Sequence, residues 1–317
     1  MLRWLVISVL ACSAAPAPTR ATAPFAFHVG FWVNLHQRLY EESGAHPRPG
    51  ALVLAAPADR DAWARAVAFY RARYPSRGFL TLLEDAELVK VNRELARVEA
   101  AGDLAGADLP AELRAALEAV APVYRAHGWP DDRAADLRFE QRLGALVDRH
   151  GGALVAALAR AYQTPWPGVV RVDIAPYAGP VAAYTVLDPP HTTIASGDPR
   201  HAGDAALEIV FHEASHALVD RVQRSIARAA AAQHRPEPPQ LWHEVLFWGT
   251  GELVRRELGA GYTPYGYANG LYARNPAWAA AEPLIARYWR DYLDGARSLD
   301  DAIDAIVAGL PATSRAG

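Results

Sequence analysis

The feature that most restricts the fold of this chain is a short polar segment inside an apolar stretch. The segment His212–His216 (HEASH) follows Ile209-Val210-Phe211 and precedes Ala217-Leu218-Val219. Apolar flanks of this kind favour a buried helix. On a helix, His212 and His216 project from the same face because they lie four residues apart. Two histidines and a glutamate in a protein interior need partners there, since unpaired polar groups are costly to bury.

The spacing of the two histidines suits a metal ion. Both imidazoles can bind one ion, and Glu213, rotated by about 100° around the helix axis, can reach a water molecule on that ion. The HExxH pattern therefore predicts two metal ligands, His212 and His216, and one general base, Glu213. It indicates hydrolysis with Zn²⁺ as the cofactor and leaves the substrate open.

Strand patterns come just before this helix. Residues 169–174 alternate like a strand, and residues 182–187 and 191–196 are two further candidates on either side of the turn at Asp188-Pro189-Pro190. Helical sequence then runs over residues 205–233 and, after a proline-bounded loop, from Pro239 to Leu258, since proline suits the first position of a helix. Two more helices are predicted at residues 277–293 and 299–310.

The first half of the chain is predicted to be mainly helical. Ala, Leu and Arg dominate residues 58–162, with helices expected up to Tyr74, over 86–100, over 110–127, and in two pieces over 131–162 that separate at Gly151-Gly152. The aromatic segment 25–42 fits a strand or a helix. We therefore expect an α+β fold that is mostly helical, with a small sheet packed on the HExxH helix, a helical N-terminal half and C-terminal helices.

The N-terminus has the pattern of an export signal. Arg3 is followed by an apolar run from Trp4 to Ala11, which is too short to cross a membrane as a mature helix. Cys12, the only cysteine in the chain, ends this run, and Val9–Cys12 is similar to the lipobox of bacterial lipoproteins. Residues 1–23 are predicted to form a signal peptide or a lipoprotein signal with a tether. Ordinary signal cleavage near Ser13–Ala15 is the alternative to a lipid on Cys12.

Export and charge restrict where the protein acts and on what. The expected location is the periplasm or the cell envelope as a lipoprotein, with membrane attachment through Cys12, or the medium as a secreted protein. The net charge of −3 shows no basic surplus, which argues against a general nucleic-acid binder. One cysteine permits no internal disulfide, so packing, and a metal where present, must stabilise the fold.

An HExxH helix that follows strands resembles the zincin superfamily of metallopeptidases. The resemblance covers roughly residues 169–258 and implies a zincin-like core, a zinc ion, and a strand that lies antiparallel to bound peptide, for which residues 191–196 are the candidate. We accordingly divide the chain into a mainly helical scaffold region, residues 24–165, and a zincin-like metal-binding catalytic region, residues 166–311, packed as one compact unit.

The residues after the motif depart from two familiar subfamilies. Metzincins continue with a glycine and a third histidine at positions that are Val219 and Val222 here, so the chain is not a metzincin. Thermolysin-like enzymes place a glutamate ligand at about the position of Pro236, which lies beside Glu237 in a proline-bounded loop. The chain fits no close subfamily.

The third metal ligand is expected in the helix that runs to Leu258. A catalytic zinc takes three protein ligands, and this helix offers His243, Glu244 and Glu252. Helical projection places His243 on the more apolar side, which favours it. An antiparallel hairpin would instead bring Glu252 beside His216, while a longer or bent connection would bring His243 or Glu244. His243 is the first choice, and Glu252 and Glu244 remain alternatives.

The remaining catalytic candidates come from less specific signals. Peptide hydrolysis needs a hydrogen-bond donor toward the developing oxyanion, and Tyr265 and Tyr267 in a tyrosine-rich loop are candidates, with His191 as another. Asp220, four residues after His216, could orient a ligand histidine.

The N-terminal pattern and the resemblance together predict an exported zinc metallopeptidase that hydrolyses a peptide or protein substrate. Two alternatives stay open. One is a non-catalytic exported lipoprotein with a structural metal site. The other is a metal-dependent hydrolase of non-peptide substrates.

Overall fold

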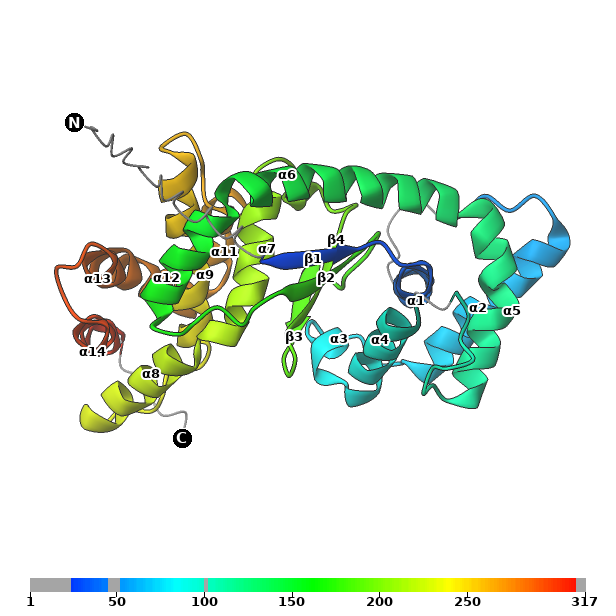
Figure 1. Cartoon of the computed structure of the whole chain (residues 1–317). Coiled ribbons are helices and arrows are strands. Elements are labelled where there is room, and N and C mark those ends of the chain that lie inside the picture. The colour runs from blue at the N-terminus through cyan, green and yellow to red at the C-terminus, as the bar shows by residue number, and fades with distance from the viewer. Residues whose placement is uncertain (1–23, 45–51, 100–101, 312–317) are drawn as a thin grey trace, which may run out of the picture.

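A four-stranded sheet lies at the centre of the molecule, between two groups of helices (Figure 1). The computed structural model describes residues 24–44, 52–99 and 102–311. The predictions for residues 1–23, including a signal segment and a lipid on Cys12, lie outside the described residues. The strand order is β1-β2-β4-β3, with strands listed here as β1 Phe25–His28, β2 Val170–Ala175, β3 Ala183–Val186 and β4 His191–Ala195.

The strand expected to bind substrate at an edge of this sheet lies inside it. β1, β2 and β4 run parallel, and β3 pairs antiparallel with β4. β4 therefore has a partner on each side, so the prediction that residues 191–196 form the substrate-binding edge strand is wrong. Of these four strands, β3 and β1 occupy the edges. Sequence periodicity located β2, β3 and β4 within a residue or two, but it left residues 25–42 as a strand or a helix, where the structure has β1 followed by a helix over Phe31–Glu42, and it carried no information about strand order.

Each face of the sheet covers a separate hydrophobic core. Residues such as Val172 and Ile174 point toward one core, and Tyr184 and Ala195 point toward the other, because side chains alternate along a strand. The second core is covered by the N-terminal helices, which are α1 Phe31–Glu42, α2 Pro57–Arg73, α3 Thr81–Glu84, α4 Ala86–Val98 and α5 Ala111–His127. The first core holds the motif helix.

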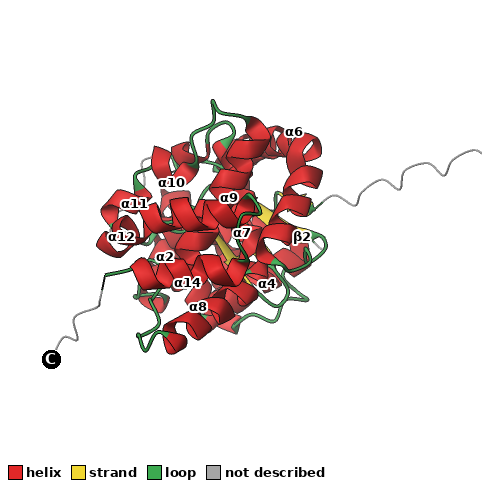
Figure 2. Ribbon diagram, turned by 90° about the vertical axis from the view of Figure 1, so that its left-hand side faces the viewer, coloured by secondary structure: helices red, strands yellow, loops and turns green. Residues whose placement is uncertain are grey.

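Helices from the C-terminal half pack on that first face, where α7 and α9 lie side by side (Figure 2). Their bounds are α7 Ala205–Ser215, η3 His216–Leu218, α8 Asp220–Ala232, α9 Leu241–Leu258, α12 Pro276–Leu284, η4 Ile285–Trp289, α13 Arg290–Leu293 and α14 Leu299–Gly309. Three short helices lie in loops, η2 Pro199–His201, α10 Tyr265–Ala268 and α11 Leu271–Arg274. The expectation of a mostly helical α+β fold is confirmed at this level.

The helix α6 connects the two groups of helices along one side of the sheet (Figure 1). It runs without interruption over Trp129–Tyr162, so the predicted break at Gly151-Gly152 is wrong. Gly151 is buried, and a β-carbon there would lie 3.2 Å from Cγ1 of Val147 and 3.4 Å from Cγ of Pro24. This glycine allows close packing and does not end the helix.

The predicted helix over residues 205–233 is also in fact divided. It becomes α7, the 3₁₀ turn η3 and α8, so the chain changes direction just after the HExxH segment. α9 begins at Leu241, after Gln240 in a left-handed conformation, and not at Pro239. Among the described residues, no helix combines the length and the apolar character needed to cross a membrane.

Candidate metal centre

Three histidines converge between α7 and α9. His212 comes from the last turn of α7, His216 opens η3, and His243 lies in the first turn of α9. Nε2 of His212 is 3.3 Å from Nε2 of His216 and 3.3 Å from Nε2 of His243. One nitrogen from each residue lies within 4.8 Å of the others, and no other group of this kind occurs in residues 24–44, 52–99 and 102–311.

Nε2 of His212 lies from each of the other two Nε2 atoms at the spacing that a shared zinc ion requires. Two nitrogen ligands on a tetrahedral Zn²⁺, each about 2.0–2.1 Å from the ion, lie about 3.3–3.4 Å from each other. Burial lowers the pKa of His216 to about 3 and the pKa of His243 to about 4, and it lowers the pKa of His212 well below the usual value. All three imidazoles are therefore neutral near pH 7, which is the form that binds a metal. The residues fit a three-histidine zinc site.

The other two candidate ligands lie outside this group. Glu252 is bound by Arg255 at 2.8 Å and by Arg256 at 2.9 Å. Burial alone would raise the pKa of Glu252, but the hydrogen bonds from these arginines outweigh it and lower the pKa. Glu244 is buried, and burial, with a smaller effect of Glu282, raises its pKa to about 9.

The bend at η3 explains why α9 presents His243 to the motif. The loop over residues 234–239 joins α9 to α8, and not directly to α7, because α7 has already ended at Ser215. A simple hairpin between the motif helix and α9 would have placed Glu252 beside His216. The inserted α8 instead lets the start of α9 reach the motif.

Aromatic rings surround the three histidines. The ring of Phe247 is 4.0 Å from that of His212, while Trp242 and Trp278 lie 5.2 Å and 5.7 Å from His243. Nδ1 of His212 is buried and has no hydrogen-bond partner among the described residues. The His212 ring is therefore oriented by packing against Phe247 and not by a hydrogen bond at Nδ1.

Glu213 lies beside the edge strand β3. Its side chain is 7% exposed, and burial raises its pKa to about 7, although a hydrogen bond from Thr185 of β3 opposes this rise. Thr185 also contacts the hydroxyl of Thr192 on β4 at 2.8 Å. The candidate base thus follows His212 directly on α7 and lies close to β3.

The structure separates the two candidate tyrosines. Tyr265 opens α10 as a buried residue, with its ring 5.9 Å from Phe247. Burial raises the pKa of Tyr265 to about 12, and the charge of Glu213 is among the smaller contributions. Tyr267 is 45% exposed, and its hydroxyl accepts a hydrogen bond from Trp248 at 3.0 Å and donates one to Glu282. Only Tyr265 lies toward the histidine cluster.

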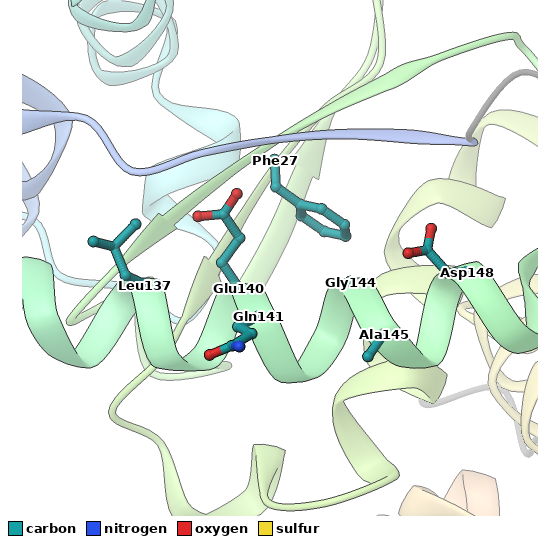
Figure 3. A pocket seen from close by; sticks show the side chains of 7 residues that line it. All are labelled: Phe27, Leu137, Glu140, Gln141, Gly144, Ala145 and Asp148. Carbon is teal, nitrogen blue, oxygen red and sulfur yellow. The ribbon is translucent and has the colours of Figure 1, made fainter.

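Two further candidates lie apart from the cluster. His191 points to the opposite face of the sheet, where Nε2 is hydrogen-bonded to Asp173, which also accepts from Arg171 at 2.8 Å. Asp220 is exposed at the start of α8, and no hydrogen bond joins it to a cluster histidine in the described part of the chain. A hollow on α6 beside β1 is also separate from the metal centre (Figure 3); it is lined by Phe27, Leu137, Glu140, Gln141, Gly144, Ala145 and Asp148.

Glu208 is the residue near the site that the sequence analysis missed. It lies four residues before His212 on α7 and is fully buried. Its carboxylate accepts hydrogen bonds from the Tyr262 hydroxyl at 2.8 Å and from the Tyr265 backbone N–H at 2.9 Å. Burial raises its pKa to about 7. A single carboxylate in the apolar run before His212 was the signal that could have identified it.

No protein-family model matches the chain, and comparisons with curated proteins and with solved structures found no match either.

Proposed function

We propose that this chain is a zinc-dependent peptidase of the zincin type. The observation that carries the proposal is the convergence of three neutral histidines, with the His212 nitrogen at tetrahedral spacing from the other two, beside the buried carboxyl of Glu213. Within the described residues, the group offers three ligand side chains and no fourth. Three protein ligands are typical of catalytic zinc sites, whereas structural sites use four, so this count favours an enzyme over a structural metal site.

The residues around the histidines have distinct parts in hydrolysis. His212, His216 and His243 would hold the zinc ion, which when bound polarises a water molecule and the scissile carbonyl. Glu213 accepts the proton of the attacking water and passes it to the leaving amine. A base whose pKa lies near 7 suits this transfer, because it can accept and release the proton at neutral pH. Tyr265 is our candidate donor to the oxyanion.

The position of β3 supports a peptide as the substrate. β3 pairs with β4 on one side and has no strand partner on its other side among the described strands. The free edge of a strand offers backbone N–H and C=O groups to an extended chain. Thr185 links this strand to Glu213, so a peptide along β3 would pass beside the base. A non-peptide substrate would make no use of this edge.

We further propose that the protein is exported, as a periplasmic or cell-envelope lipoprotein or as a secreted protein. This proposal is supported by the apolar run from Trp4 to Ala11 and by Cys12 at its end. Labelling cells with a radioactive fatty acid tests the lipid. Incorporation that is lost in Cys12→Ala supports the anchor, and equal labelling of both proteins contradicts it.

The exchange of Glu213 for glutamine tests the proposed chemistry. We expect Glu213→Gln to keep its zinc and to cleave a peptide library more slowly by roughly 10²–10⁴-fold, because the amide cannot accept a proton. Zinc is measured by elemental analysis, and cleavage by mass spectrometry with and without a chelator. Glu237→Gln, at an exposed position, is the matched control. Cleavage at the wild-type rate by Glu213→Gln would show that Glu213 is not the base.

A further inference from the structure

Glu208 connects the motif helix to the loop that leads into α10. Its carboxylate contacts this loop at both Tyr262 and Tyr265, at 2.8 Å and 2.9 Å. Both bonds go to the same oxygen, Oε2. The residue that precedes α10 is Pro264, whose side chain cannot cap a helix. Glu208 therefore takes the role of a capping residue although it lies 57 residues earlier in the chain.

The environment of Glu208 is costly for a carboxylate. The residue is 0% exposed, and its Oε1 has no hydrogen-bond partner among the described residues. An unsatisfied buried polar atom destabilises a fold, so an apolar residue of similar size would pack here at a lower cost. Packing alone does not explain a carboxylate at this position. Its two bonds to the loop therefore indicate that Glu208 holds the loop in place.

The facing helix α9 leaves room for this arrangement. A β-carbon on Gly251 would lie 3.0 Å from Oε1 of Glu208 and 3.0 Å from Cβ of Pro264. Gly251 is therefore the position at which α9 admits both the carboxylate and the loop. A side chain there would push against the two groups that determine where α10 begins.

The same contacts fix Tyr265 relative to the metal centre. Glu208 lies one helical turn before His212 on α7, so the loop is bonded to the helix that carries the first histidine. On the other side, the Tyr265 ring packs 5.9 Å from Phe247, which in turn packs 4.0 Å from His212. Tyr265 thus has one link through the backbone and one through ring packing.

We infer that Glu208 is a positioning residue, which through its bonds to Tyr262 and to the Tyr265 backbone holds Tyr265, the candidate donor, against Phe247 beside the histidine cluster. The inference rests on the proposed peptidase function. Glu208 itself is not one of the three grouped histidine ligands. Its removal should therefore lower kcat and leave KM and zinc content nearly unchanged.

Amide hydrogen exchange on the whole chain tests whether Glu208 holds this loop, and it does not require catalytic activity. In Glu208→Gln, amide exchange over residues 259–270 should become faster by about tenfold or more, because the backbone bond at Tyr265 is weakened. Exchange over α14 should not change. Tyr262→Phe removes one of the two bonds and keeps the carboxylate, so exchange over residues 259–270 should rise by a smaller factor. This variant serves as the test if Glu208→Gln does not fold. Unchanged exchange over residues 259–270 in both variants overturns the inference.

A double-mutant cycle tests the link to Tyr265. If Glu208 acts through Tyr265, then Glu208→Gln should lower kcat in the wild-type background and have no further effect in Tyr265→Phe. Equal fold-losses of kcat in both backgrounds would overturn the inference and indicate a general structural role. Glu118→Gln, an exposed site on α5, is the matched control. Absence of chelator-sensitive cleavage by the wild-type protein overturns the proposed function itself. The exchange experiment would then still decide whether Glu208 holds the loop over residues 259–270.

Discussion

Burial sets the protonation state of the side chains at the candidate site. It lowers the pKa values of the three histidines and raises those of Glu208 and Glu213 to about 7. The physical cause is the same in each case, because a low-dielectric interior disfavours the charged form. Neutral imidazoles beside a carboxyl that ionises near pH 7 suit the proposed hydrolysis with zinc.

The identity of the third zinc ligand can be tested by substituting single residues. His243→Ala should bind zinc at least about 100-fold more weakly, since it removes one of three nitrogens from the ion. Glu252→Ala should keep wild-type affinity, because the structure pairs Glu252 with two arginines instead. Zinc affinity is measured by competition with a chromogenic chelator. Equal loss in the two variants would contradict the assignment of His243.

Asp136 on α6 gives a prediction about pH. Burial raises its pKa from 3.8 to about 8, while Ser196 donates a hydrogen bond to it. The folded state therefore keeps a proton that the unfolded state has lost, so the free energy of unfolding falls as the pH rises from 3.8 toward 8, by at most about 1.4 kcal/mol per pH unit. Asp136→Asn, a neutral mimic, should weaken this dependence. Urea unfolding near pH 5 and near pH 8 measures it, and an identical slope in the variant would contradict the prediction.

Several elements are stabilised by residues that are far away in the sequence. The N-terminus of α1 follows Gly30, which offers no capping side chain, and α1 has no acidic residue in its first turn. The carboxylate of Glu99 instead accepts from the backbone N–H groups of Phe31 at 2.7 Å and Trp32 at 3.3 Å. This is the same arrangement that Glu208 makes at α10. The positive end of a helix dipole favours such a carboxylate.

The cap of α1 yields a stability prediction. Glu99→Ala should lower the free energy of unfolding by about 0.5–2 kcal/mol, since two buried N–H groups lose their acceptor. Gly30→Ala should also destabilise, because its β-carbon would lie 2.5 Å from Oε2 of Glu99. Chemical unfolding followed by circular dichroism measures both. Glu118→Ala, at an exposed helix position, is the control, and a loss as large as that of Glu99→Ala would argue against the cap.

Helix and strand positions followed from local sequence, while their ends and pairings did not. Periodicity indicated β2, β3 and β4 to within about two residues, and α9 to within two residues at its start. It could not show that β3 forms an edge, because strand order depends on contacts between distant segments. It also misjudged Gly151, whose role is set by Val147 and Pro24.

At the scale of the whole molecule, the sheet joins the two halves of the chain. β1 belongs to the N-terminal half and pairs with β2 from the C-terminal half over four residues on each strand. The two faces of the same sheet cover two cores, and α6 packs along both groups of helices. Neither core can lose its strands without exposing the other.

This shared sheet predicts one cooperative unfolding transition that zinc stabilises. A ligand that binds only the folded state at 100 times its Kd adds about 2.7 kcal/mol, so a chelator should lower the Tm by roughly 5 °C. Calorimetry with and without chelator measures the shift, and in His243→Ala, at the same zinc concentration, the shift should fall to about 1 °C or less. Two separate unfolding transitions, with only one of them shifted by the chelator, would show that the two cores unfold independently and would contradict the prediction.

The sequence by itself determined the mostly helical α+β class and the helical motif segment with its two histidines and a glutamate. These features depend on residues within a turn or two of one another, so the sequence carries them directly. Only the tertiary structure decided that His243 meets His212, that β3 is the edge beside Glu213, and that Glu208 reaches Tyr265. Each of these contacts joins segments that are distant in the chain, and they form because the bend at η3 and the shared sheet bring those segments together.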